Sequence, residues 1–298
     1  MDFLRPTTWE EALAAKADRP DAVPIQGGTD VMVEINMDVR RPAALLDLNQ
    51  VAELREWAMV GGTVSGTVGG TAGGMCRVGA AVPYARIIEE LAGPLPGLAQ
   101  AARTVGSPQI RNRGSVGGNL GAASPAGDSH PPLLAAGAVV EAESRERGVR
   151  MIPADEFYLG VKRSALEPDE LIRAVHVRPA TGPQYFSKVG TRNAMVIAVC
   201  SFAIALHPGE RRVGTGIGSA APTPRRALEA EELLARELDW TAPLDPALSR
   251  RFGELCAAAA APIDDVRGKA AYRVHAIGVM ARRTLAWAWN DHLGRRAA

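Results

Sequence analysis

Cysteine is scarce in this 298-residue chain and occurs only at Cys76, Cys200 and Cys256. The three residues are far apart and form no C-x-x-C pair, so the sequence encodes neither a disulfide framework nor a cysteine-ligated metal or iron–sulfur site. The five histidines lack ligand spacing such as H-x-x-x-H, and we predict no metal site. Reduced thiols are typical of the cell interior, so we expect a cytoplasmic protein.

Long apolar runs are also missing. The longest, residues 195–206, has 12 residues, whereas a membrane-spanning helix needs about 20. The first residues, Met-Asp-Phe-Leu-Arg-Pro, show no basic stretch followed by an apolar run, and we expect neither a secretory signal nor a membrane span. The motifs G-x-S-x-G and the kinase signature set are absent, and no catalytic residue is predicted.

Neither sign of charge is in excess. The 34 Lys and Arg residues and the 33 Asp and Glu residues give a net charge of +1. Nothing in this balance steers the chain toward nucleic acid or an anionic membrane, and we expect neither as a partner.

The residues that are present indicate a globular protein, because 47% are hydrophobic and 22% are charged, close to the average of soluble domains. A length of 298 residues favours two domains or one large one. The character of the sequence changes after the Thr181-Gly182-Pro183 turn. We therefore predict one domain over residues 1–180 and a second over residues 181–298.

The first of these domains mixes predicted helices with predicted strands. Thr8-Trp9-Glu10-Glu11 is a capping-box pattern that predicts a helix up to Lys16. Further helices are expected over 31–35, 84–91 and 95–105, strands over 23–26, 45–48 and 171–177, and one or two hairpins over 58–82. Residues 106–128 are rich in Gly, Ser, Asn and Pro without periodicity, which predicts a loop, and a loop this long needs a functional reason.

The second domain is expected to be a three-stranded antiparallel sheet covered by helices. The strands are predicted over 185–188, 196–206 and 213–218, and the helices over 224–237, 246–261 and 269–292. This pattern is an α+β unit. The third strand contains Gly-Thr-Gly-Ile-Gly at 214–218, which does not fit the G-x-G-x-x-G dinucleotide fingerprint, and we expect no nicotinamide binding there.

Two glycine-rich stretches carry the functional signal. The first glycine motif, residues 24–31, reads Pro-Ile-Gln-Gly-Gly-Thr-Asp-Val and places two glycines where a strand stops. Such a turn exposes backbone N–H groups that suit a phosphate, although the motif taken alone is a weak signal that a plain tight turn explains better. The second glycine motif, residues 104–120, contains Gly-Ser-Val-Gly-Gly-Asn-Leu and is followed by Ser-Pro-Ala-Gly-Asp at 124–128. Its Ser, Gly and Asn residues suit a pyrophosphate and ribitol hydroxyls.

Together the motifs resemble the flavin-binding subunit, or flavin domain, of the molybdenum hydroxylases, the family of xanthine dehydrogenase, aldehyde oxidase and carbon monoxide dehydrogenase. Their order and spacing match, and later segments, among them 186–192 and 265–268, are similar to the family's C-terminal landmarks. The resemblance covers nearly the whole chain. It implies the α+β fold of vanillyl-alcohol oxidase-like flavoproteins: a FAD-binding domain of two α+β subdomains, divided near residue 55, and then a C-terminal domain with a three-stranded antiparallel sheet and helices.

The resemblance also implies one FAD. The first motif would wrap the pyrophosphate and ribitol, the second would complete this cradle, and Asp128, Ile172 and Lys188 would lie near the isoalloxazine and adjoining parts. An ammonium group at Lys188 would favour the anionic reduced ring, with a solvated strand lysine as the alternative. No suitably placed His or Cys lies within the motifs, so we expect non-covalent binding. The implied cofactor-binding residues are Ile25, Gln26, Gly27, Gly28, Thr29, Asp30, Val31, Val105, Gly106, Ile110, Gly114, Ser115, Gly118, Asn119, Asp128, Ile172 and Lys188.

Some positions leave a choice or depart from the family. Arg111 and Arg113 are expected either to face the flavin phosphates or to help set the loop of the second motif, with ordinary solvated arginines as the alternative. Residues 189–197 lack the aromatic side chain that covers the flavin in some members, so Ile197 or nothing would shield it. The segment 61–74 is richer in glycine than the family pattern.

The function implied is that of the flavin subunit of a multi-subunit molybdenum hydroxylase. Electrons from the [2Fe–2S] clusters of a small partner subunit would pass through FAD to NAD, a quinone or oxygen. A molybdopterin-binding large subunit would oxidise the substrate, and the wording of the second motif favours a purine such as xanthine. The alternatives are a self-contained flavin oxidoreductase on the same fold and a scaffold subunit without flavin.

Overall fold

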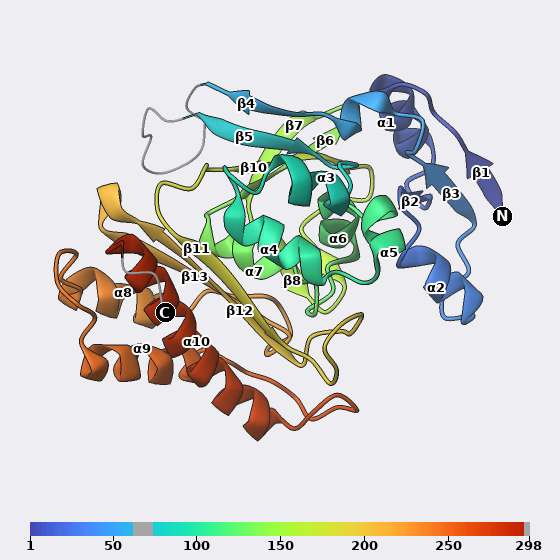
Figure 1. The fold of residues 1–298 in the computed structure, drawn as a ribbon. Coiled ribbons are helices and arrows are strands. Elements are labelled where there is room, and N and C mark those ends of the chain that lie inside the picture. Colours follow the sequence, from blue (N-terminus) through green and yellow to red (C-terminus); the bar gives the residue numbers. More distant parts are fainter. Residues whose placement is uncertain (62–73, 295–298) are drawn as a thin grey trace.

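Figure 1 shows the computed structural model, which describes residues 1–61 and 74–294. The N-terminal end contains a parallel three-stranded sheet in the order β1–β3–β2. Its elements are β1 (Asp2–Leu4), α1 (Trp9–Asp18), β2 (Val23–Ile25), α2 (Val31–Asn36) and β3 (Ala44–Asp47). Helix α1 begins as predicted at the capping box, where Thr8 Oγ1 accepts a hydrogen bond from the Glu11 amide. Because β2 and β3 run parallel, the residues that follow each of them emerge at the same edge of the sheet.

A five-stranded antiparallel sheet follows, in the order β4–β5–β10–β6–β7. Its strands are β4 (Trp57–Val60), β5 (Met75–Gly79), β6 (Val139–Ser144), β7 (Gly148–Pro153) and β10 (Leu171–Val177); the short helix η1 (Ala52–Arg55) precedes β4, and β8 (Tyr158–Gly160) pairs with β9 (Arg163–Ser164). Strands β4 and β5 form a hairpin as predicted, and the glycine-rich residues 62–73 between them lie outside the described residues. Sequence reasoning misses β6 because nearly all of its residues are buried, which removes the polar–apolar alternation of a half-buried strand.

A helical layer occupies the middle of the molecule (Figure 1). It consists of α3 (Tyr84–Glu90), α4 (Pro96–Thr104), α5 (Pro108–Arg113), α6 (Val116–Ala122) and α7 (His130–Ala135). Helices α5 and α6 correct the loop predicted over 106–128. Each begins at a serine whose side chain accepts a hydrogen bond from the third residue along: Ser107 from Ile110 at 3.3 Å and Ser115 from Gly118 at 3.2 Å.

The C-terminal part contains the predicted antiparallel sheet, in the order β11–β12–β13. Its elements are β11 (Gln184–Val189), β12 (Cys200–His207), the short helix η2 (Pro208–Glu210), β13 (Arg212–Gly218), α8 (Leu228–Glu237), α9 (Pro246–Ala258) and α10 (Ala270–His292). Along β12, Phe202 and Ile204 pack into the cluster formed with α8, α9 and α10, whereas Ala203 and Ala205 pack with Ala135 of α7. The sheet therefore separates α7 from the three C-terminal helices (Figure 1).

Two C-terminal elements begin later than predicted. Strand β12 starts at Cys200 rather than at residue 196, because Met195 has a φ of +52° and the Arg192 guanidinium donates to the Ala194 carbonyl, which shapes residues 190–197 into a loop. Helix α8 starts at Leu228 rather than at residue 224, because Arg225 forms a backbone bridge to Ile217 of β13.

Buried apolar side chains form two main clusters. One contains residues between Trp9 and Val177, and the other contains residues between Cys200 and Trp289. The mixed arrangement of sheets and helices confirms the predicted α+β class. Among the described helices, none is both long and apolar enough to cross a bilayer.

Candidate functional site

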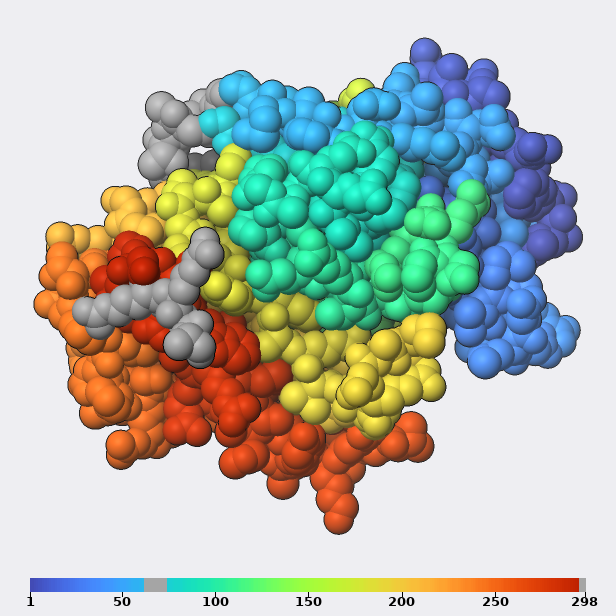
Figure 2. All heavy atoms as spheres, viewed as in Figure 1, coloured from blue at the N-terminus to red at the C-terminus, as the bar shows by residue number. Residues whose placement is uncertain are grey.

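The two glycine motifs lie against each other. A Cβ built on Gly27 would lie 2.2 Å from the Arg113 carbonyl oxygen, and one built on Gly114 would lie 3.4 Å from Thr29 Oγ1. Gly27 thus has no room for a side chain, because the backbone of the second motif occupies that space. Helix α5 lies beside α2 and β2 in Figure 1, and the molecular outline is indented between α2 (blue), α5 (green) and the loop after β11 (yellow) in Figure 2.

The backbone of the first motif presents a row of free donors. Within the described residues, the amides of Gln26, Gly27, Gly28, Thr29, Asp30 and Val31 donate no hydrogen bond to the protein. The chain turns here from β2 into α2, and Gly28 adopts a φ of +71° that favours glycine. Backbone N–H groups require partners, and successive ones in a turn form a concavity suited to an anion.

Asn49, which sequence reasoning misses, fixes this turn from the neighbouring strand. Its Nδ2 donates to the Gln26 carbonyl and to Asp47 Oδ1, each at 2.6 Å. Its Oδ1 accepts a hydrogen bond of 3.2 Å from Arg113. The available signal was positional: Asn49 directly follows the strand predicted over 45–48, and polar residues at the ends of adjacent parallel strands meet at one edge.

The second motif is held in shape by its arginines. Arg111 donates to the carbonyls of Val105 and Gly106 at 3.2 and 3.0 Å. Of the interpretations considered for Arg111 and Arg113, these contacts and the bond to Asn49 correspond to setting the loops. Gly106 has a φ of +48°, and a Cβ there would lie 2.7 Å from Ile110 Cγ2, so Gly106 and Ile110 pack together.

The glycines of α6 differ in what surrounds them. A Cβ on Gly117 would lie 2.5 Å from the Ala80 carbonyl oxygen, so Gly117 permits close packing of α6 on the residues after β5. Gly118 is exposed, and a Cβ there would meet only Ser115 Oγ, at 3.4 Å. Gly118 therefore faces open space next to the first turn of α6.

A buried ion pair links the helical layer to the C-terminal sheet. Lys188 Nζ of β11 lies 2.5 Å from Asp128 Oδ2, and the two side chains are 9% and 7% exposed. Thr104 completes the group, since its hydroxyl lies 2.9 Å from the same Asp128 oxygen and its carbonyl accepts a bond of 3.3 Å from Lys188. Burial raises the pKa of Asp128 above its usual value, and Lys188 and Thr104 partly oppose this shift. Lys188 is thus not the solvated lysine of the alternative interpretation.

The other residues expected near the flavin differ in how deeply they are buried. Ile172 of β10 is buried beneath α6, with its Cδ1 3.8 Å from the Cβ position of Gly121. Asn119 is half-buried on α6, and Val105 is half-buried at the end of α4. Ile197 is 53% exposed on the loop after β11.

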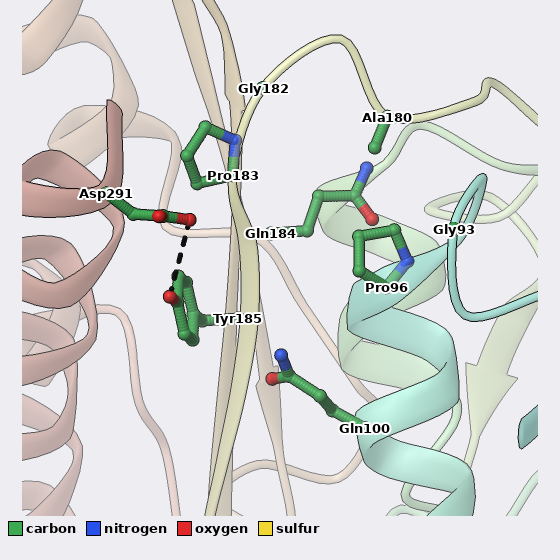
Figure 3. Close-up of a pocket in the computed structure, with 9 residues that line it drawn as sticks. All are labelled: Gly93, Pro96, Gln100, Ala180, Gly182, Pro183, Gln184, Tyr185 and Asp291. Atoms are coloured by element: carbon green, nitrogen blue, oxygen red, sulfur yellow. Dashed lines mark hydrogen bonds between the residues drawn. The ribbon is translucent and has the colours of Figure 1, made fainter. Parts of the chain in front are cut away.

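A cavity of about 430 Å³ lies elsewhere, between the start of α4, the start of β11 and the end of α10 (Figure 3). Figure 3 shows Tyr185 directed toward Asp291 on one side of β11, with Gln100 and Gln184 on the other side of the strand. None of its lining residues belongs to the predicted cofactor-binding set. The candidate site is therefore the junction of the glycine motifs with Asp128 and Lys188.

Comparisons with known proteins identify the family of the chain. Residues 1–180 match the family described as FAD binding domain in molybdopterin dehydrogenase, and residues 185–288 match the CO dehydrogenase flavoprotein C-terminal domain.

Relatives are similar over nearly their full length. A xanthine dehydrogenase FAD-binding subunit of Escherichia coli is 32% identical over 95% of this chain and 94% of its own. The carbon monoxide dehydrogenase medium chain of Afipia carboxidovorans is 30% identical over 96% and 95%. A caffeine dehydrogenase subunit beta from a Pseudomonas species is 30% identical over 84% of both.

Solved structures show the same fold. A chain of carbon monoxide dehydrogenase from Hydrogenophaga pseudoflava superposes with a TM-score of 0.85 at 26% identity, over 100% of this chain and 98% of that one. A chain of reconstituted CO dehydrogenase from Oligotropha carboxidovorans gives a TM-score of 0.85 at 28% identity, over 97% of each.

Proposed function

Because the chain belongs to the family of FAD-binding subunits of molybdopterin dehydrogenases, an oxidoreductase family whose cofactor is FAD, we propose that it holds one FAD non-covalently at the junction of its glycine motifs. The six free amides of residues 26–31 are the observation that carries this proposal. They would donate to acceptor oxygens of the pyrophosphate and ribitol.

Other features of the junction fit the same cofactor. Asp128 Oδ1 is buried without a partner and can accept a hydrogen bond from a hydroxyl or ring N–H group. Gln26 Oε1 is likewise buried and unpartnered. The open space at Gly118 leaves room for a ligand against α6. The roles of the predicted cofactor-binding residues are proposals on these grounds.

The residues near the ion pair would set the surroundings of the flavin. FAD, when bound, supplies reversible uptake of electrons. Lys188 would present an ammonium group to it, but the 2.5 Å contact with Asp128 makes the pair neutral overall when Asp128 is ionised. We therefore infer that the pair orients the polar groups of the site more than it adds positive charge. Ile172, buried below α6, would supply an apolar wall.

We propose that electrons reach FAD from [2Fe–2S] clusters of a small partner subunit and leave to NAD, a quinone or oxygen. The clusters require another chain, because Cys76, Cys200 and Cys256 are buried in three separate elements, β5, β12 and α9. A molybdopterin-binding large subunit would oxidise the substrate. The names of two relatives point to the purines xanthine and caffeine, which supports a purine as that substrate.

The acceptor can be identified by reoxidation. The FAD-loaded chain is reduced anaerobically with one equivalent of dithionite and mixed in a stopped-flow instrument with NAD⁺, a soluble quinone or oxygen. We expect one acceptor to restore the flavin absorbance at least tenfold faster than the others. Failure of all three would contradict an external acceptor at this chain. Turnover of a substrate by the chain alone would support the self-contained enzyme, and a chain without flavin affinity would support the scaffold.

A further inference from the structure

The amide oxygen of Asn119 is held from inside the protein. Ser129, which is fully buried just before α7, donates a hydrogen bond of 2.6 Å from its Oγ to Asn119 Oδ1. Asn119 is one turn into α6 and half-buried. Neither the glycine motifs nor their spacing pointed to Ser129.

A third side chain extends this contact into a chain of hydrogen bonds. The hydroxyl of Tyr84, which is 2% exposed, lies 3.2 Å from Ser129 Oγ. A serine hydroxyl has a single proton, and an amide oxygen can only accept, so the Ser129 proton points to Asn119. Tyr84 must then donate to Ser129. The chain of hydrogen bonds runs in one direction, from Tyr84 through Ser129 to Asn119.

The consequence is a fixed orientation of the Asn119 amide. With Oδ1 engaged by Ser129, Nδ2 is the remaining polar atom, and it has no partner within the described part of the chain. Gly127 leaves room for this arrangement, because a Cβ there would lie 2.7 Å from Asn119 Oδ1. Asn119 therefore presents a donor rather than an acceptor at the surface of α6.

We propose that Ser129 and Tyr84 are positioning residues that hold Asn119 Nδ2 toward a pyrophosphate oxygen of FAD. This inference rests on the proposed function, which places FAD beside α6. A donor suits that oxygen because phosphate oxygens at neutral pH only accept hydrogen bonds. The amides of residues 26–31 present the same polarity from the first motif.

The test is a double-mutant cycle on FAD affinity, measured by fluorescence titration of the apo-protein. We expect Asn119→Ala to weaken FAD binding by about tenfold, as for one hydrogen bond to a charged group. Ser129→Ala should weaken it by about fivefold, and Tyr84→Phe by about threefold, because the amide loses its fixed orientation. In the Asn119→Ala background, neither change should have a further effect. Asn119→Asp should be worse than Asn119→Ala, since it directs a carboxylate oxygen at the phosphate.

A control separates this role from general destabilisation. Ser144 is as buried as Ser129, and its Oγ accepts a bond from the Arg147 amide in the turn between β6 and β7. Ser144→Ala should leave FAD affinity unchanged. If Ser129→Ala lowers FAD affinity equally in the wild-type and Asn119→Ala backgrounds, the positioning role is overturned. An Asn119→Asp variant that binds FAD like wild type would also overturn it. If Ser129→Ala does not fold, Tyr84→Phe decides by the same cycle. A wild-type chain that binds no FAD would contradict the proposed function instead.

Discussion

Lys188 and Asp128 are a buried pair whose energetics depend on pH in a defined direction. The pKa of Asp128 is raised by burial and lowered by Lys188 and Thr104, so removing the ammonium raises it further. When the folded-state pKa of a carboxyl lies above the unfolded value of about 3.9, the unfolded state releases its proton first. The free energy of unfolding then falls as the pH rises from the pKa of the unfolded state toward the pKa of the folded state.

We therefore expect Lys188→Met to lower the free energy of unfolding by about 3 kcal/mol at pH 7.5, the usual penalty for breaking a buried pair. The loss should be clearly smaller at pH 4.5. Urea unfolding of the flavin-free protein at both pH values measures this. Asp128→Asn with Lys188→Met should recover most of the loss at pH 7.5. A penalty that is equal at both pH values would show that Asp128 does not titrate in this way.

A substitution at Gly118 tests FAD binding separately from folding. The residue has no positive φ, and the space around its Cβ position is open. Gly118→Val should thus fold with a Tm within about 3 °C of wild type, while FAD affinity falls at least a hundredfold because the side chain fills the proposed cradle. The control is Gly209→Val, at a position in η2 where no atom lies within 4 Å of the Cβ position. Unchanged FAD titration of Gly118→Val would remove α6 from the site.

At the residue scale, sequence reasoning reaches the side chains within a motif and misses those outside it. Gly27, Gly118 and Asp128 stand within recognisable patterns. Asn49 lies just after β3, and Ser129 directly follows the 124–128 motif, but each acts through a hydrogen bond to a residue of a glycine motif at least ten positions away. These contacts come from the tertiary structure, and neither motif contains the residue that makes them.

Among the elements, α7 and β13 show why a glycine-rich strand need not bind a nucleotide. A Cβ on Gly214 or Gly216 would lie 2.0 Å from the carbonyl oxygens of Ala135 and Pro131, respectively. These glycines allow the backbone of α7 to lie directly on the sheet.

Gly216→Ala should consequently lower the free energy of unfolding by about 2–3 kcal/mol, the range of overpacking in a core. Gly209→Ala should change it by less than about 0.5 kcal/mol, as is usual for exposed positions. Urea denaturation compares the two variants. Wild-type stability of Gly216→Ala would mean that α7 and β13 are not in close backbone contact.

Element prediction succeeded where periodicity was strong and failed where local chemistry prevailed. The capping box of α1 and the apolar pattern of α10 gave nearly correct bounds. Helices α5 and α6 are short, and α6 is also rich in glycine. Both begin at serine caps, Gly117 of α6 packs against Ala80, and Gly114 after α5 lies against Thr29. Fully buried β6 lacks any alternation to detect.

At the scale of the whole molecule, two contacts connect the regions of the two hydrophobic clusters. They are the Lys188–Asp128 pair and the contact of α7 with the C-terminal sheet. The α+β class and the family follow from sequence, whereas the domain limits at residue 180 and near residue 55 stay predictions. The site spans both clusters, since Lys188 comes from β11 and the glycine motifs from the elements before it.

At this scale we expect the isolated chain to oxidise neither xanthine nor an aldehyde, because its cysteines cannot hold the clusters that the proposed electron path needs. Assays of xanthine and aldehyde oxidation with a soluble dye as acceptor test this. The same assay on the complex that co-purifies with the chain should show activity. Oxidation of either substrate by the pure chain would favour a self-contained enzyme.

The central claim is that the junction of the glycine motifs holds one FAD without a covalent bond. The most direct measurement titrates the flavin-free chain with FAD by calorimetry, followed by acid precipitation and flavin analysis of both fractions. We expect one FAD per chain, an affinity for FAD that Gly118→Val lowers at least a hundredfold, and all of the flavin in the supernatant. A chain that binds no FAD, or flavin that stays with the precipitated polypeptide, would contradict it.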